Sequence, residues 1–187
     1  MREIDPIHAA YHEAGHAVIL ESAGVTVRWV TVENDGISGY CRHAFPGCIT
    51  NIEDAFKQGT FALCGALAEQ RYRTGGDAEK WAAALEWKAD REEEDIEFIR
   101  SELEGGMEDE DGLWGDAYDV HKCLLMLEES SRYGTLSECI EALVEHAGSV
   151  VVEQWQSIEA VAGHLLRERY LEGQDVRDII EGVQLTR

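Results

Sequence analysis

The amino-acid sequence predicts a mainly α fold with a small antiparallel β-sheet, that is, an α+β domain. Three observations lead to this expectation. Long stretches of small and apolar residues begin with helix-capping signals, a β-branched segment alternates before an Asn-Asp-Gly turn, and no repeat or low-complexity linker divides the chain. Because 187 residues are enough for one sizeable core, we expect a single domain over residues 1–187.

The N-terminal part predicts a helix followed by two strands. Asp5 is a good N-cap, Pro6 suits the first helical position, and Gly24 suits the end of a helix. An alternating β-branched run over 26–33 and a second run over 37–42 flank the Asn-Asp-Gly turn. We expect these two runs to pair as the small sheet.

The rest of the chain predicts helices joined by loops. A Thr followed three residues later by a Glu forms a capping box at a helix start, and this pattern occurs at two places. The expected helices run from Thr50 with Glu53 to about 72, over about 78–103, from Asp116 or Asp119 to about 130, from Thr135 with Glu138 onward, and from Asp175 as a short last helix, with an acidic loop over 105–115.

The motif that carries chemistry lies in the first of these helices and reads His12-Glu13-Ala14-Gly15-His16. Residues four apart share one helix face, so the imidazoles of His12 and His16 can both reach one metal ion. The carboxylate of Glu13 lies beside the open coordination position, where it can activate a zinc-bound water as general base. The pattern predicts a Zn²⁺ site. His8 extends the row, but about 12 Å of helical rise separates it from His16, too far for one tetrahedral ion.

A catalytic zinc site needs a third protein ligand, and the residues alone leave several candidates open. Either a carboxylate oxygen or an imidazole nitrogen can complete the site at a similar distance. The candidates are Asp95, Asp90, Glu94, His121, His146 and His164. A second metal held by Cys41, His43 and Cys48 is not expected, because the polar residues of a hairpin account for them without a fourth ligand.

Several segments resemble the peptidase domain of the FtsH-type ATP-dependent zinc metalloproteases, and above all its stand-alone relatives without the ATPase domain. The segment 10–18 is similar to the zinc helix of that family, in which alanine and glycine between the histidines are typical. Residues 27–40, 61–70 and 154–176 resemble the strand pair and the later helices. The resemblance implies a zincin-like HExxH helix in a helical metallopeptidase domain.

The same resemblance implies which residue is the third zinc ligand. In the family this is an aspartate followed by an apolar residue at the head of a helix. Asp95, which precedes Ile96, fits this pattern, and Asp90, which precedes Arg91, fits it less well. We therefore expect His12, His16 and Asp95 to hold the zinc ion.

The charge and composition of the chain restrict the classes of partner and the cellular compartment that we expect. Lysine plus arginine total 16 against 38 aspartate plus glutamate, a formal charge of −22, which would repel nucleic acid and an anionic membrane surface. This acidic excess fits either a high-salt habitat or attraction of basic peptides. No run approaches the roughly 18 apolar residues of a membrane span, and no signal peptide is recognisable. With five cysteines and no Cys-x-x-Cys pair, we expect a cytoplasmic protein with free thiols.

These observations predict a zinc metalloendopeptidase that hydrolyses unfolded or extended polypeptides. The chain has no Gly-x-x-x-x-Gly-Lys-Ser/Thr loop, so we expect ATP-independent cleavage, with a homo-oligomer or a separate unfolding partner as possible additions. The alternative is a non-catalytic domain that keeps the zinc site and binds peptides as an adaptor. A zinc hydrolase acting on another substrate would use the same residues.

Overall fold

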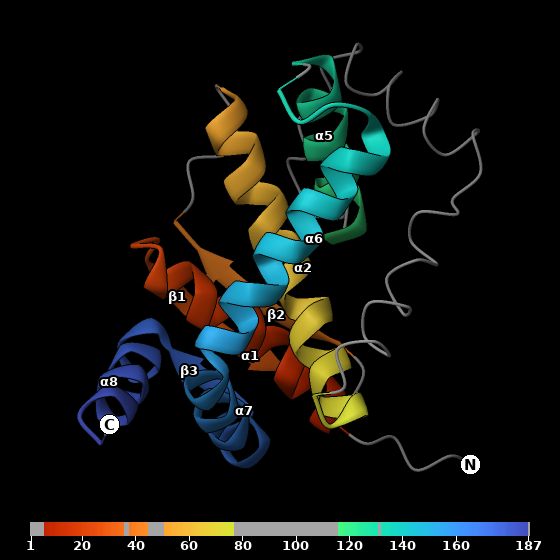
Figure 1. Ribbon diagram of the computed structural model, residues 1–187. Helices are drawn as coiled ribbons and strands as arrows, with labels where there is room; N and C mark the ends of the chain where they lie inside the picture. The colour runs from red at the N-terminus through yellow and green to blue at the C-terminus, as the bar shows by residue number, and fades with distance from the viewer. Residues whose placement is uncertain (1–5, 36–37, 45–50, 77–115, 131, 187) are drawn as a thin grey trace.

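The computed structural model describes residues 6–35, 38–44, 51–76, 116–130 and 132–186, and these residues form helices around one small sheet (Figure 1). The mainly helical α+β architecture predicted from the sequence is confirmed over these ranges. In chain order the elements are α1 (Ile7–Ser22), β1 (Val27–Val32), β2 (Gly39–His43), α2 (Ile52–Thr74), α5 (Asp116–Glu129), α6 (Leu136–Glu153), α7 (Trp155–Glu168), β3 (Tyr170–Glu172) and α8 (Gly173–Gln184).

The sheet is antiparallel, and its strands lie in the order β2-β1-β3. In the middle strand, Val30 lies opposite Cys41 of β2 and Leu171 of β3. The sequence predicts only β1 and β2. The third strand is three residues long and too short to show an alternating pattern; it pairs because Arg169 adopts a left-handed conformation with φ 64° that ends α7 and turns the chain back towards β1.

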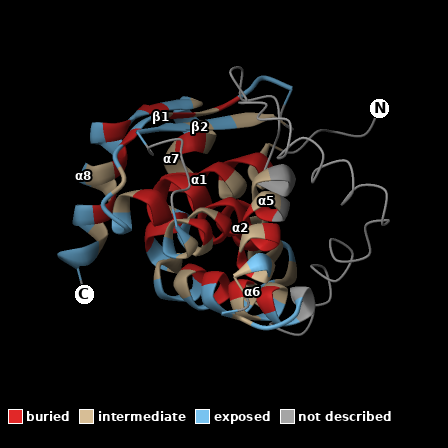
Figure 2. Ribbon diagram, turned by 90° about the horizontal axis from the view of Figure 1, so that it is seen from above, coloured by how far each residue is buried: buried red, intermediate tan, exposed pale blue. Residues whose placement is uncertain are grey.

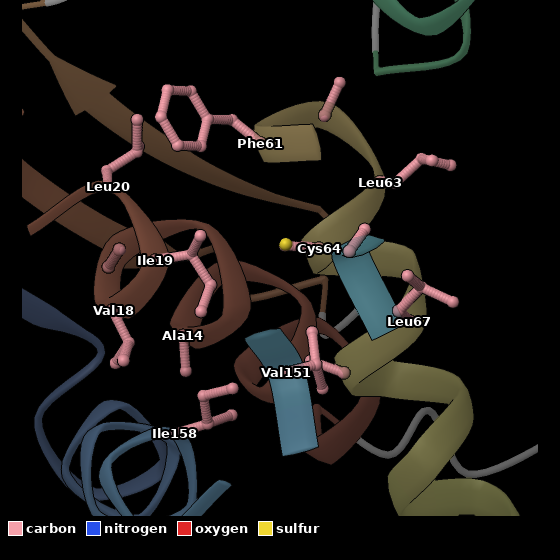
Figure 3. Close-up of a cluster of buried hydrophobic side chains, with 14 of the residues drawn as sticks. Ala14, Val18, Ile19, Leu20, Phe61, Leu63, Cys64, Leu67, Val151 and Ile158 are labelled. Atoms are coloured by element: carbon pink, nitrogen blue, oxygen red, sulfur yellow. The ribbon is translucent and has the colours of Figure 1, made fainter. Parts of the chain in front are cut away.

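Helix α1 forms the centre of the molecule and packs against α2, α7 and β1. Figure 2 shows buried residues concentrated on α1 and α2, between the sheet on one side and α6 on the other. Figure 3 shows Val18 and Ile19 of α1 in one cluster of buried side chains with Leu67 of α2, Val151 of α6 and Ile158 of α7. Burial of these side chains is the main contribution to the stability of the arrangement.

The axes of α1 and α2 approach closely because small residues lie between them. A Cβ atom at Gly15 would lie 2.7 Å from the carbonyl oxygen of Cys64 and 2.8 Å from the Cβ of Ala68, closer than packed atoms tolerate. Gly65 of α2 lies on the other side of the same contact, 3.1 Å from that Cβ position. The small residues inside and around the motif therefore set the distance between the two helices.

The residues that cap the helices agree with the sequence predictions at some positions and differ by one residue at others. Pro6 occupies the N-cap of α1 and not the first helical position. The predicted capping box for α2 is wrong by one residue, because Asn51 is the N-cap and its side chain accepts from the backbone N–H of Asp54. The capping box of Thr135 and Glu138 is confirmed at the start of α6.

The predicted C-terminal helical region consists of two helices that meet at Gln154, and Glu172 caps α8, so that Asp175 stands at the third helical position and not at the start. The expected helix over 78–103 and the acidic loop over 105–115 lie outside the described residues. No helix among the described residues has the length and apolar character needed to cross a membrane.

Candidate metal centre

His12 and His16 of α1 point their imidazoles at each other from successive turns. The Nε2 atoms of the two rings are 3.2 Å apart, and the ring centroids are 4.9 Å apart. His16 is buried with 8% of its surface exposed, whereas the side chain of His12 is 24% exposed. The pair therefore has an inner member in the core and an outer member that solvent reaches.

The other nitrogen of each ring faces an acceptor on α2. His16 Nδ1 lies 2.9 Å from the carbonyl oxygen of Phe61, and His12 Nδ1 lies 3.4 Å from Oε2 of Glu69. A carbonyl and an ionised carboxylate can only accept, so we infer that both Nδ1 atoms carry a proton. Each neutral ring then presents a lone pair at Nε2, and the two lone pairs face each other.

This arrangement fits a zinc ion. Two lone pairs 3.2 Å apart repel unless a proton or a cation lies between them. Nitrogen atoms bound to one tetrahedral zinc ion at about 2.0–2.1 Å are about 3.3–3.4 Å apart, close to the distance found here. Metal-binding histidines usually donate their second N–H to a carboxylate or a backbone carbonyl, as both rings do.

Glu69 is ionised in this setting. Burial alone would raise the pKa of its carboxyl group, but the hydrogen bond with His12 and the positive charge of Arg73 outweigh that effect, and the net pKa lies below its ordinary value. An ionised Glu69 is an acceptor only, which is consistent with a proton on Nδ1 of His12. Arg73, one turn further along α2, forms an ion pair with Glu69.

Two glycines leave room for the site. A Cβ atom at Gly65 would clash with three ring atoms of His16, so only glycine lets the imidazole lie against α2. A Cβ atom at Gly39, the first residue of β2, would clash with the side chain of Glu13. Glu13 is itself buried, with 7% of its surface exposed. Strand β2 thus begins directly against the residue predicted to be the general base.

Strand β2 also brings His43 towards the pair. Gly39, Cys41 and His43 alternate along β2 opposite the buried residues of β1, so they face α1. The pKa of His43 is lowered first by the burial of part of its ring, and then by electrostatic interactions with His16 and Arg42. Sequence reasoning considered His43 only for a second metal, because it could not show that the strand crosses the motif.

The remaining candidates divide into two groups. Three carboxylates, Asp95, Asp90 and Glu94, lie outside the described residues, as do Cys48 and the side chain of His121. The other two histidines have other neighbours: His146 lies against Phe56 with ring centroids 5.3 Å apart, and His164 pairs with Glu168 at 3.2 Å. Within the described part of the chain, no group of three or more potential metal-binding side chains comes together.

The sequence analysis did not name Glu69 as a functional residue, although its spacing from Gly65 could have indicated it. Gly65 and Glu69 are four residues apart on α2, as His12 and His16 are on α1, and the two helices pair His16 with Gly65 and His12 with Glu69. In this protein the shared spacing places the glycine beside the inner histidine and the glutamate beside the outer one. Without the packing, however, the sequence does not say that these two helices touch.

Comparison of the chain with protein-family models and with curated protein sequences gives no match.

Proposed function

We propose that the chain is a zinc metallopeptidase that hydrolyses peptide bonds of unfolded or extended polypeptides, similar to the peptidase domain of the FtsH-type proteases. The observation that carries the proposal is the pair of imidazole lone pairs, 3.2 Å apart, with both Nδ1 atoms held by acceptors. Both Nε2 atoms are thereby turned towards one point, where a single ion can reach the two rings.

In this proposal His12 and His16 hold the zinc ion and Asp95 completes the site. A bound zinc ion would polarise the substrate carbonyl and lower the pKa of a water molecule towards about 7. Glu13 accepts the proton of that water as general base and then passes it to the amine that leaves when the peptide bond breaks. The packing of Glu13 against Gly39 of β2 supports this role, because it limits the positions that the buried carboxylate can take.

The position of β2 supports an extended substrate. In the described part of the chain β2 pairs on one side only, with β1, and its first residue lies against Glu13. A peptide that added to the other side of β2 by backbone hydrogen bonds would pass beside the proposed base. A folded protein does not present such a strand. We therefore propose a zincin-like arrangement, in which the HExxH helix lies under a sheet whose edge strand receives the substrate.

Metal analysis combined with a protease assay tests the proposal. The purified protein should bind about one zinc ion per chain and cleave an unfolded protein, and Glu13→Gln should keep the metal while cleavage falls by orders of magnitude. The glutamine retains the size of the side chain but cannot accept the proton. Equal activity of the two proteins would contradict the role of Glu13. Zinc and peptide binding without cleavage by either protein would favour the adaptor alternative.

A further inference from the structure

Behind the histidine pair, α1 and α2 form three facing pairs of residues, each one helical turn from the next. His16 faces Gly65, His12 faces Glu69, and further from the core His8 faces Arg73. The third pair lies outside the motif, and the proposed function assigns it no role. It is nevertheless connected to the site, because Arg73 also contacts Glu69.

Arg73 holds Glu69 from the side opposite His12. Nη2 of Arg73 pairs with Oε1 of Glu69, while Nδ1 of His12 lies 3.4 Å from Oε2 of the same carboxylate. The two oxygens are therefore committed to different partners. A carboxylate held at both oxygens keeps one orientation, whereas a carboxylate held at one oxygen rotates about its terminal bond.

His8 fixes the guanidinium in turn. Nε of Arg73 donates to Nδ1 of His8 at 3.1 Å, and the ring of His8 packs edge-on against Tyr72 with centroids 6.0 Å apart. Because a guanidinium only donates, Nδ1 of His8 must be an acceptor. Arg73 is thus tied at both ends of its planar group, a geometry that an ammonium group cannot reproduce.

We propose that Arg73, anchored by His8, is a positioning residue of the metal site. It holds the carboxylate of Glu69 on Nδ1 of His12, and so keeps Nε2 of His12 turned towards His16. The inference rests on the proposed function, since it assigns the network to the binding of zinc by the histidine pair.

The exposure of Arg73 separates this role from a merely structural one. Its side chain is 48% exposed, and ion pairs that solvent reaches to this extent contribute little to stability. Loss of Arg73 should therefore leave the midpoint of urea unfolding of the metal-free protein nearly unchanged, while zinc binding weakens. A residue that only supported the fold would lower both together.

Zinc affinity, measured by competition with a chromophoric chelator, is the first test. Loss of an outer hydrogen-bond partner of a zinc-binding histidine lowers metal affinity by about 10- to 100-fold. We expect a loss in this range for Glu69→Gln and a loss near its lower end, about tenfold, for Arg73→Gln. His8→Phe should weaken binding less, and Arg73→Lys, which keeps the charge beside Glu69, should restore part of the affinity.

A double variant and a matched control sharpen the test. Because Arg73 is proposed to act through Glu69, the double variant Glu69→Gln/Arg73→Gln should bind zinc no more weakly than Glu69→Gln alone. Arg177→Gln breaks a similar pair with α1, in which Nη1 of Arg177 lies 2.8 Å from Glu21, and should leave zinc affinity unchanged. Additive losses for the double variant, or an equal loss for Arg177→Gln, would overturn the proposal.

A second readout needs no metal. The ¹⁵N chemical shifts of the imidazole of His12 report which ring nitrogen carries the proton. In the metal-free wild type the tautomer of His12 that is protonated at Nδ1 should dominate. In Arg73→Gln this tautomer and the one protonated at Nε2 should both be populated. An unchanged ratio would overturn the positioning role. If the wild-type protein bound no zinc, the proposed function would fail, but the ¹⁵N measurement would still decide whether Arg73 orients His12. If the wild-type protein and Arg73→Gln bound zinc equally tightly, only the inference on Arg73 would fail.

Discussion

A methyl group at position 65 tests whether His16 lies where the site requires it. In Gly65→Ala the added Cβ would clash with Nε2, Cδ2 and Cε1 of the His16 ring. His16 cannot move away without cost, because its Nδ1 is held by the carbonyl of Phe61 at 2.9 Å. The substitution therefore forces either the ring or the helix backbone to shift.

The magnitude follows from two opposing effects. Replacing glycine by alanine inside a helix stabilises a protein by about 0.5–1 kcal/mol, because the unfolded chain loses freedom. Inserting a methyl group into a packed contact costs about 1–3 kcal/mol. The free energy of unfolding of metal-free Gly65→Ala should therefore fall by about 1 kcal/mol, within a range of about 0–2.5 kcal/mol. Zinc affinity should fall by at least about tenfold, since the displaced ring loses its orientation.

Urea unfolding and chelator competition measure the two effects, and Gly182→Ala is the matched control. Gly182 lies in α8, and a Cβ there would meet no atom within 4 Å. This control should raise the free energy of unfolding by about 0.5–1 kcal/mol and leave zinc binding as it is. If Gly65→Ala behaved like Gly182→Ala in both measurements, the close packing of His16 against α2 would be refuted.

Three further predictions concern the metal and the substrate. His12→Ala and His16→Ala should each abolish stoichiometric zinc binding, Asp95→Ala should weaken it strongly and Asp90→Ala should not; metal analysis of the four proteins checks this, and a reversal of the last two results would show that the third ligand was wrongly chosen. Zinc at 100 times its dissociation constant should raise the free energy of unfolding by about 2.7 kcal/mol relative to the chelated protein, and an unchanged urea midpoint would show that zinc does not bind the native state selectively. Cleavage of a disordered casein-like substrate should exceed cleavage of a stable globular protein and should not respond to ATP; stimulation by ATP in a peptide-release assay would contradict the absence of energy coupling.

The sequence was sufficient where local chemistry decides the structure. The end of α2 at Gly75 follows from a residue that tolerates the left-handed conformation, with φ 67°, and the start of α6 follows from the Thr135 capping box. The β1 and β2 segments are detectable because β-branched residues alternate on either side of a turn. In each case, the residues that fix the element lie within one turn of it.

The sequence was insufficient where partners lie far apart along the chain. Strand β3 pairs with β1 across more than a hundred residues, and a three-residue segment carries no periodic signal of its own. The contact of His12 with Glu69 spans 57 positions and depends on the packing of α1 against α2. The sequence could name the histidine pair, because its spacing is local, but not the acceptors that orient the two rings.

Burial explains why the site and the fold depend on each other. Glu13 and His16 are among the few buried polar or charged residues in the described ranges, and both lie on α1, a helix in which most residues are buried. Removing such groups from water is costly unless they gain partners inside the protein. The carbonyl oxygen of Phe61 lies 2.9 Å from Nδ1 of His16, and Nε2 of His12 lies 3.2 Å from its other ring nitrogen. If the proposed zinc ion binds between the two imidazoles, it adds a further partner inside the core, so loss of the metal should weaken the packing around α1 as well as the site.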